Sequence, residues 1–554
     1  MPSDEKGEEQ EPMALSGNEN IVIIGGGPIG MTLALDLAYR GVSSTIIEKT
    51  DGRIETPKLG LISVRTMEIF RRLGISNYVK DTKFKRDYGL SMVYCTSIAT
   101  HFLGKIPYPS LEDEPSYPGS PETKWRCSQI FLNPMLEERV EACPQIDYQR
   151  MTQFERFEDD GDEVIVHVRN VENNITSKLR TPYLIGCDGA GSRVRKQLEI
   201  EMLGEGALDH SVAIFFRSAA LASEQKMGEA ERYFFVDDKG WWGNISAMDG
   251  YELWRLTVSG ADGKSESVVE NAASWVRRAL GSDDLSFELI SALPWRRSQL
   301  TASEFSKGRV FLAGDSAHTM SPTGGLGMNT GMGDVNNLAW KLTACVQGWG
   351  GENLLNSYSI ERRPIADRNA SVSTQNFNQL KSVVDCTGIL DETPEGEGVR
   401  QKIGTKITEA TKTEWETMGV HLGYRYEASP ILAADGTDEP YDDHRYYVQT
   451  ARPGHRAPHA WLGGGPANGL STLDLFGPGF VLLRLGKFPQ SCDTFERTAR
   501  KRNIPLRVID LDRADLLELY EAPLVLVRPD GHVAWRGQTV PEDAEQLWDT
   551  VTGA

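Results

Sequence analysis

The stretch NIVIIGGGPIGMTLALDLAYRGVSSTIIEK, residues 20–49, decides the fold. A short β-branched run, IVII, predicts a strand; a glycine-rich turn and a helical pattern follow, and a second strand ends at Glu48. The glycines fall at Gly25, Gly27 and Gly30. In that spacing they allow a tight turn, close approach of the backbone to a diphosphate, and packing of the helix on the strand. The stretch therefore predicts a Rossmann-type unit that binds an adenine dinucleotide.

The acid at the end of the second predicted strand narrows the choice of dinucleotide. Glu48 lies 18 residues after Gly30, where a carboxylate accepts hydrogen bonds from ribose hydroxyls. Its negative charge disfavours a 2'-phosphate, so NADP is the least expected occupant, while FAD and NAD both stay open. Lys49 follows directly and is a further candidate for cofactor contact.

A second glycine-rich stretch, GRVFLAGDSAHTMSPTGGLGMNTGMGDVNNLAWKL at residues 308–342, predicts the other half of a cofactor site. A strand ends at Asp315, a loop with Pro322 follows, and an amphipathic helix begins with Asn329 as its N-cap. A helix N-terminus favours negative charge by about 0.3–1 kcal/mol, which suits a reduced flavin. Asp315, a short acceptor at a strand end, suits the hydroxyls of a ribityl chain.

Composition excludes several classes of function. The 554 residues, 40% hydrophobic and 25% charged, are those of an ordinary globular protein of two or three domains. A formal net charge of -20 argues against nucleic acid or an anionic membrane surface as partner. Seven scattered cysteines without a CxxC pair indicate free thiols in a reducing cytoplasm and no metal site. The acidic residues 1–18 have no apolar core of a signal peptide and predict a disordered tail.

A third motif connects the first two. The run YLIGCDGAGSRVR contains Asp188, Gly189, Ser192 and Arg195 in an Asp-Gly-x-x-Ser-x-x-Arg pattern after a predicted strand. With this motif the sequence resembles the class A FAD-dependent monooxygenases, particularly the aromatic-ring hydroxylases of the phenol hydroxylase group. The C-terminal runs PGHRAPHAWLGGG and APLVLVRPDGHVAWRG resemble the thioredoxin-like domain of that group.

The resemblance implies an α/β architecture: a Rossmann-type FAD domain of the glutathione-reductase kind, an inserted β-rich substrate domain, and a thioredoxin-like α/β domain without CxxC. The implied segments are the FAD domain at 19–84, 120–200 and 300–385, the substrate domain at 85–119 and 201–299, a linker at 386–450, and the thioredoxin-like domain at 451–554.

The resemblance also implies cofactor contacts residue by residue. FAD would be bound non-covalently, with Glu48 at the adenosine ribose and Asp315 at the ribityl hydroxyls. Further contacts are implied along the FAD chain for Arg65 and Gln129, at the Asp-Gly motif for Asp188, Gly189 and Arg195, and at the flavin ring for Pro322, Gly327, Met328 and Asn329. Pro322, in the loop beside the ring, is the residue implied nearest the reaction.

The implied reaction uses NADPH or NADH and O2, through a flavin C4a-hydroperoxide, to hydroxylate an aromatic phenol, including one derived from a polyketide. Such chemistry needs a dry pocket. We predict that Tyr233, Phe235, Trp241 and Trp242 line it, although each aromatic residue alone is equally consistent with core packing. At the position where phenol hydroxylases carry an aspartate the chain has Gly60, which leaves the group that activates the phenol unassigned.

Two other functions stay open. The same flavin scaffold supports Baeyer–Villiger oxidation or epoxidation of a secondary metabolite, and a non-oxygenating FAD reductase or binding protein would share the cofactor motifs. We expect a small aromatic substrate and O2 as partners, no nucleic acid, no membrane span and no metal. The C-terminal domain is expected to be either a structural module or the interface of a homodimer.

Overall fold

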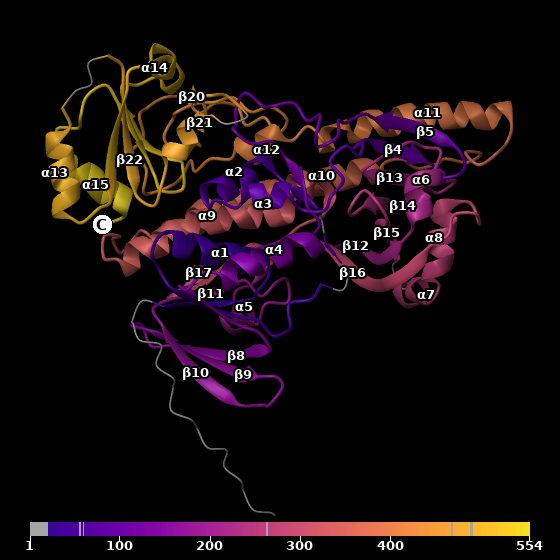
Figure 1. The fold of residues 1–554 in the computed structure, drawn as a ribbon, viewed down its shortest axis with the longest axis horizontal. Coiled ribbons are helices and arrows are strands. Elements are labelled where there is room, and N and C mark those ends of the chain that lie inside the picture. The colour runs from indigo at the N-terminus through magenta and orange to yellow at the C-terminus, as the bar shows by residue number, and fades with distance from the viewer. Residues whose placement is uncertain (1–19, 55–56, 59, 262–263, 467–468, 488–490) are drawn as a thin grey trace, which may run out of the picture.

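The computed structural model describes residues 20–554 apart from 55–56, 59, 262–263, 467–468 and 488–490. The tail predicted for residues 1–18 lies outside the described residues. In Figure 1 the C-terminal residues, in yellow, form one end of the molecule. The glycine-motif elements lie in the middle, and a large sheet with its helices forms the other end.

The middle part is a Rossmann-type sheet, as predicted. Its six strands lie in the order β17-β18-β11-β1-β2-β7, and all neighbours are parallel except β17 and β18. The strands are β1 (Ile21–Ile24), β2 (Ser44–Ile47), β7 (Ile146–Gln149), β11 (Leu184–Gly186), β17 (Ser306–Lys307) and β18 (Val310–Leu312). Central β1 and β2 are buried along their whole length because both faces of a parallel sheet are covered.

Helices cover this sheet and carry the cofactor motifs. They are α1 (Pro28–Tyr39), α2 (Val64–Arg72), α3 (Ser76–Lys80), α4 (Gln129–Glu141), α5 (Arg193–Gln197), α9 (Leu326–Val346) and α10 (Ser357–Lys381). Helix α1 packs on both α4 and α9. An antiparallel sheet of β8 (Thr152–Asp159), β9 (Val164–Asn170) and β10 (Thr176–Thr181) lies beside this part.

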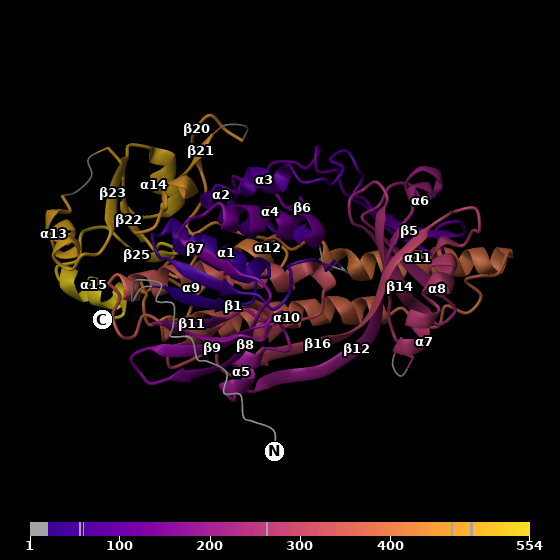
Figure 2. The same cartoon turned by 60° about the horizontal axis from the view of Figure 1, so that its bottom comes forward.

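The large sheet has eight strands in the order β19-β16-β12-β15-β14-β13-β4-β5. They are β4 (Met92–Cys95), β5 (Phe102–Ile106), β12 (Met202–Arg217), β13 (Arg232–Asp237), β14 (Gly240–Ala247), β15 (Leu253–Val258), β16 (Glu288–Ala302) and β19 (His318–Thr319). The paired strands β12 and β16 run from the nucleotide part to the far end of the molecule (Figure 2). Helices α6 (Ala219–Glu224), α7 (Ser265–Glu270) and α8 (Ala272–Leu280) belong to the same end.

The linker interpretation of residues 386–450 is wrong in its central part. The segment contains α11 (Pro394–Thr411), the 3-10 turn η3 (Lys412–Glu414) and α12 (Met418–Leu422). Helix α11 packs on β5, and its Ile403 and Ile407 join a core cluster with strands β4 and β13. Apolar side chains on one helix face explain this packing, so the segment is part of the substrate end.

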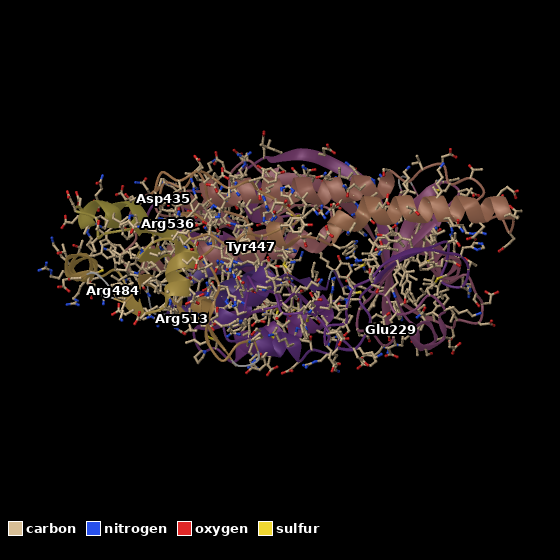
Figure 3. The ribbon with its side chains drawn as sticks, turned by 90° about the horizontal axis from the view of Figure 1, so that it is seen from above. Glu229, Asp435, Tyr447, Arg484, Arg513 and Arg536 are labelled. Atoms are coloured by element: carbon tan, nitrogen blue, oxygen red, sulfur yellow. The ribbon has the colours of Figure 1, made fainter. Side chains whose placement is uncertain are left out.

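The C-terminal part has the strand order of a thioredoxin-like sheet, β23-β22-β24-β25, with β22 and β23 parallel and the other pairs antiparallel. Its elements are β22 (Phe480–Leu485), α13 (Asp493–Lys501), β23 (Leu506–Leu511), α14 (Ala514–Tyr520), β24 (Leu524–Val527), β25 (Val533–Gly537) and α15 (Ala544–Thr552). A small hairpin of β20 (Trp461–Gly463) and β21 (Leu470–Ser471), followed by η4 (Thr472–Leu475), precedes them. Figure 3 labels Arg536 beside Asp435, whose carboxylate accepts its Nε hydrogen bond at 2.6 Å.

Candidate functional site

The glycines of the first motif occupy positions that larger residues would block. Gly25 has a φ of +112°, and a Cβ there would lie 2.3 Å from the carbonyl oxygen of Cys187. A Cβ on Gly30 would lie 2.0 Å from the carbonyl oxygen of Gly25. These contacts confirm the tight turn and the close packing of α1 that the spacing predicts.

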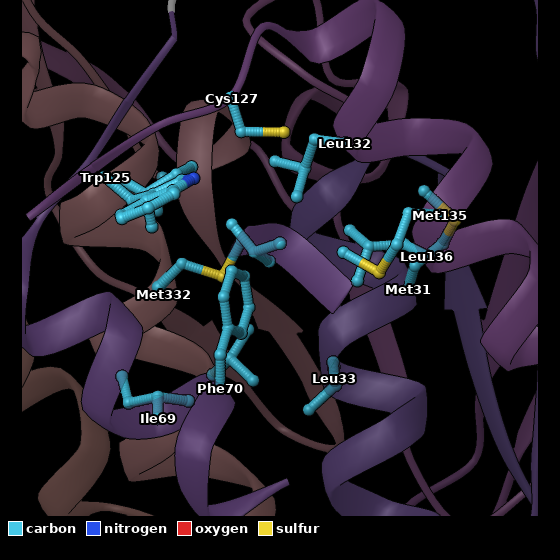
Figure 4. Close-up of a cluster of buried hydrophobic side chains, with 14 of the residues drawn as sticks. Met31, Leu33, Ile69, Phe70, Trp125, Cys127, Leu132, Met135, Leu136 and Met332 are labelled. Atoms are coloured by element: carbon cyan, nitrogen blue, oxygen red, sulfur yellow. The ribbon is translucent and has the colours of Figure 1, made fainter. Parts of the chain in front are cut away.

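Gly27 differs from its neighbours because its Cα faces open space. A Cβ there would meet no atom within 4 Å among the described residues. Gly27 is the N-cap of α1, and no side chain caps that helix. An uncapped helix N-terminus with open space before it fits a diphosphate, which accepts hydrogen bonds from free backbone N–H groups. Helix α1 is held in place by the buried cluster in Figure 4, where Met31 and Leu33 lie near side chains of α2 and α4.

Glu48 lies directly beside this turn, after β2. Its Oε2 accepts a hydrogen bond from the N–H of Gly26 at 2.9 Å. Its Oε1 accepts from the N–H and the hydroxyl of Thr50, at 2.9 and 2.7 Å. Lys49 is exposed next to it. The carboxylate is therefore oriented at the carboxyl end of the sheet, where its predicted role toward ribose stays a prediction.

The Asp188 motif follows β11, the parallel neighbour of β1. Asp188 Oδ2 accepts from the backbone N–H groups of Arg193 and Val194, at 2.7 and 3.3 Å. Its Oδ1 is buried without a hydrogen-bond partner among the described residues. Gly189 has a φ of +78°. An oriented carboxylate with one free oxygen beside the glycine turn fits a polar cofactor chain.

Arg195 of the same motif connects the Asp188 loop to the turn that carries Asp315. Its guanidinium donates to the carbonyl oxygens of Ser316 and Ala190, at 2.7 and 3.0 Å. Arg195 therefore fixes the turn η1 (Gly314–Ser316), which carries Asp315, against the Asp188 loop. This is a positioning contact, and a direct contact of Arg195 with FAD stays a prediction.

Lys58, which the sequence gave no reason to select, brings two predicted cofactor residues together. Its Nζ lies 3.4 Å from Asp315 Oδ2, and its backbone N–H donates to Gln129 Oε1 at 3.2 Å. Gln129 is the first residue of α4. Asp315 and Gln129 thus both contact Lys58, and their contact with FAD stays a prediction.

A buried ion cluster stabilises the turn that carries Asp315. Asp334 of α9 accepts from His318 Nε2 at 2.7 Å, from Arg362 Nε at 2.8 Å and from the N–H of Gly314 at 3.1 Å. Burial alone raises the pKa of Asp334, but the neighbouring His318 and Arg362 lower it below its ordinary value. His318 therefore has a structural hydrogen bond to Asp334.

The loop from Pro322 leads into α9 differently from the prediction. Gly324 and Gly325 have φ values of +82° and +67°, and α9 begins at Leu326 with Gly325 as its N-cap. The N-cap assigned to Asn329 is thus wrong, because two left-handed glycines start the helix earlier. Pro322 and the half-buried Gly327 and Met328 border this helix start.

Asn329 instead clamps α9 to the segment before α2. Its Oδ1 accepts from the N–H of Ser63 and the hydroxyl of Thr66, at 2.9 and 2.7 Å. Its Nδ2 donates to the carbonyl oxygen of Leu61 in β3 (Leu61–Ile62), which pairs with β6 (Trp125–Arg126). Asn329 therefore ties the first turn of α9 to β3 and to the start of α2.

Arg65 contacts α2 and the C-terminal part of the chain. Its guanidinium donates to Glu68 at 2.9 Å and to the carbonyl oxygen of Asp530 at 3.0 Å. Glu68 also forms a buried ion pair with Arg456. Arg65 thus belongs to the contact between α2 and the C-terminal part, and its predicted place along the FAD chain gains no support from these contacts.

Three neighbouring hollows that share lining residues, here called the sheet cavity, lie where the large sheet meets the Pro322 loop. Their volumes are about 80, 30 and 20 Å³. Their lining includes Phe234, Trp241 and Trp295 of the sheet, Trp415, and Pro322, Thr323 and Gly324 of the loop. The buried indole N–H groups of Trp241 and Trp415 have no acceptor among the described residues.

The pocket prediction is thereby corrected for three of its four aromatic residues. Trp241 lines the sheet cavity. Tyr233, Phe235 and Trp242 lie on the opposite face of the sheet, in the main core cluster. Trp242 stacks on Phe235 there at a ring distance of 5.1 Å. Because side chains alternate along a strand, Arg232 and Phe234 face the cavity when Tyr233 and Phe235 do not.

Glu414 is a cavity residue that the sequence analysis missed. It is 2% exposed, and its Oε1 accepts from the N–H of Gly324 at 3.1 Å. Its Oε2 has no hydrogen-bond partner among the described residues. Burial raises the pKa of Glu414 to about 7, although nearby Arg232 and the Gly324 N–H lower it. A single acid in a turn-rich segment carries no sequence pattern that would have selected it.

The fold and the glycine turn together define a dinucleotide-binding α/β protein with a substrate sheet beside the cofactor loops. Comparison with protein families gives a match to the FAD binding domain over residues 18–373, and one to the aromatic-ring hydroxylase C-terminal domain over residues 450–554. The chain belongs to the FAD-dependent monooxygenases of the aromatic-ring hydroxylase group. It is a flavoprotein enzyme with FAD as its cofactor.

Individual relatives cover nearly the whole chain. The FAD-dependent monooxygenase apdD of Emericella nidulans is 30% identical, over 96% of this chain and 90% of its own. A solved structure of RebC with bound 7-carboxy-K252c has a TM-score of 0.89 at 35% identity, covering 97% of this chain and 99% of that one. Aklavinone-11 hydroxylase with FAD and aklavinone has a TM-score of 0.82 at 25% identity, covering 98% and 100%. Among the helices that the structure describes, none has the length and apolar character needed to cross a bilayer.

Proposed function

We propose that the protein hydroxylates an electron-rich aromatic small molecule, a phenol of the polyketide type, using NADPH or NADH and O2. The observation that carries the proposal is the sheet cavity, which places Trp241, Phe234 and Trp415 against the loop of Pro322 to Gly324. Flat aromatic walls beside a loop that borders the flavin suit an aromatic substrate. One of the similar solved structures, aklavinone-11 hydroxylase, holds FAD together with aklavinone.

Different described residues would bind different parts of FAD. The N-terminus of α1 would hold the diphosphate, Glu48 the adenosine ribose and Asp315 the ribityl chain, while Asn329 fixes the helix start beside the ring. When bound and reduced, FAD would supply the electrons that activate O2, and the transferred oxygen atom would come from O2. The protein excludes water from the site through the buried aromatic lining of the sheet cavity.

Glu414 is the side chain best placed to accept the proton of a substrate phenol. Its free Oε2 is buried, and its pKa near 7 matches the requirement for a general base at neutral pH. Arg232 at 3.7 Å, together with Glu231 and Arg297, sets its electrostatic surroundings. Removal of the proton makes the ring more electron-rich and so more reactive toward an electrophilic oxygen.

The test is product analysis with heavy-isotope oxygen. Purified holoenzyme is incubated with NADPH or NADH and a panel of phenols, and product masses are measured. Incorporation of one labelled oxygen as a ring hydroxyl is expected. Ring-inserted or epoxide products without any hydroxylated phenol would refute hydroxylation in favour of the alternative oxygen chemistries. Comparing the oxidation rates of NADPH and NADH decides the co-substrate.

The Glu414→Gln variant tests the base. Wild-type hydroxylation should rise with pH through about 7, and the variant should lose this limb and about 100-fold or more in rate. An unchanged pH profile would exclude Glu414 as the base. The cytoplasmic location and the homodimer stay predictions, and sedimentation of the holoenzyme tests the second.

A further inference from the structure

Three arginines of the large sheet face the sheet cavity together. Arg232 of β13, Arg255 of β15 and Arg297 of β16 all line it, and they are called the arginine triad below. Arg232 and Arg255 both pair with Ser246 of the intervening strand β14, so they lie in one row across the sheet. Neighbouring strands are about 4.8 Å apart, so two long side chains in such a row can reach one ligand group.

Arg232 and Arg297 are buried, Arg255 is half-buried, and all three are incompletely paired. Arg232 and Arg297 are 8% and 4% exposed, and the Nε–H of each of the three has no acceptor among the described residues. Within that part of the chain, Arg255 forms no ion pair, and its Nη1 donates to a neutral group, the carbonyl oxygen of Pro57, at 3.0 Å. Arg297 Nη1 donates to the hydroxyls of Ser321 and Thr323, at 2.8 and 3.3 Å.

The nearby acids neutralise this charge only in part. Glu231 already pairs with Arg126 and lies 3.7 Å from Arg232. Asp209, near Arg297, accepts hydrogen bonds from Ser211 and from the N–H of Gly260. Glu414, at 3.7 Å from Arg232, is partly protonated at neutral pH because its pKa is about 7.

Burial and mutual repulsion act on the triad in the same direction. Burial, followed by the positive charges of Arg232 and Arg297, lowers the pKa of Arg255 to about 10. Burial also lowers the pKa of Arg297 to about 10, against the effect of Asp209 and Glu414. With pKa values of about 10, Arg255 and Arg297 stay charged at neutral pH. Buried positive charge without a full set of acceptors is costly, and an entering anion removes that cost.

We propose that the arginine triad binds a carboxylate substituent of the aromatic substrate. The inference rests on the proposed function, since it names the class of molecule that enters the same cavity. Arginine donates two parallel hydrogen bonds to a carboxylate, and the free Nε–H groups of the triad provide such donors. Because Arg297 bonds the loop residues Ser321 and Thr323, a carboxylate held here would orient the ring relative to the Pro322 loop.

The test compares salicylate, an aromatic phenol with a carboxylate, with its uncharged methyl ester. Binding to FAD-loaded enzyme is measured through the change in the visible flavin spectrum. The wild type should bind salicylate about 10- to 100-fold more tightly than methyl salicylate, the ratio expected for charge-assisted hydrogen bonds. Arg255→Met should abolish this preference while the FAD content stays unchanged, and Arg255→Lys should restore part of it.

Arg217→Met is the matched control, because Arg217 is an exposed arginine at the end of β12 in the same sheet. It should keep the wild-type preference. Methyl salicylate binding as tightly as salicylate, salicylate failing to bind, or an Arg255→Met variant with an intact preference would each overturn the proposal. The proposed function can fail independently of the anion site. If salicylate binds through the triad but no labelled oxygen enters any phenol, hydroxylation is refuted while the anion site is supported.

Discussion

Replacing Asp334 with asparagine removes the charge that holds the cofactor turn in place. Asp334 is fully buried, and its carboxylate accepts from His318, Arg362 and the N–H of Gly314, the residue before Asp315. An asparagine keeps the shape but presents an N–H₂ group to at least one of these donors. Arg362 is also left as a buried cation without its carboxylate.

Breaking one partner of a buried ion pair costs about 3–5 kcal/mol, because the remaining charge stays desolvated. For a FAD-binding part of about 230 residues, that loss lowers the melting temperature by roughly 6–10 °C. The difference in stability between the wild type and Asp334→Asn depends on pH. An aspartate whose folded pKa is lowered contributes stability above its unfolded pKa, about 3.9, and this is lost as the pH falls through the folded value. The two proteins should therefore converge in stability in strong acid.

Thermal melting and FAD titration of the apoprotein measure both effects. Asp334→Asn should melt lower and bind FAD more weakly than the wild type at pH 7. Asp367→Asn, the same change at an exposed position of α10, should match the wild type in both assays. A variant of Asp334 that melts within about 1 °C of the wild type and retains its FAD affinity would show that the buried cluster does not hold the cofactor turn.

Three further changes test separate contacts. Gly27→Ala should leave the melting temperature of the apoprotein unchanged, because the new Cβ meets no described atom within 4 Å. The same change should weaken FAD binding at least about tenfold, and an unchanged FAD affinity would contradict a diphosphate at this turn. Glu68→Gln should lower the free energy of unfolding by about 3–5 kcal/mol, since it leaves the buried charge of Arg456 unpaired. It should also make the C-terminal part sensitive to limited proteolysis, and wild-type resistance would argue that the Glu68–Arg456 pair does not hold that part in place. Arg195→Met should weaken FAD binding about tenfold through loss of its bonds to Ser316 and Ala190, and Arg195→Lys should not restore it. Full rescue by lysine would mean that charge alone matters.

The cofactor half of the site was accessible from the sequence because its constraints are local. The places of Gly25 and Gly30 follow from backbone conformation and contacts within one βαβ unit, and the structure confirms both. Glu48 and Asp315 could likewise be placed at strand ends. The contacts of Arg65 were not accessible, because they depend on Glu68 and on the distant carbonyl oxygen of Asp530.

The substrate half was less accessible for a different reason. Strand β13 is apolar on both faces, so alternation alone could not tell whether Phe234 or Tyr233 faces the cavity. Of the triad, only Arg255 interrupts an apolar strand, since Arg232 begins β13 and Arg297 follows Arg296, so the sequence did not show that the three line one cavity. The helix α11 was indicated, by Ile403 and Ile407 at a spacing of four, but its acidic, turn-rich flanks favoured a linker.

The Gly25 turn and the Asp315 loop should form one flavin site, and the flavin content of the purified protein tests this most directly. We predict a yellow wild-type protein with one FAD per chain that acid precipitation releases. Asp315→Ala should be bleached under the same purification. A colourless wild type that does not take up added FAD would show that the two segments do not form a flavin site.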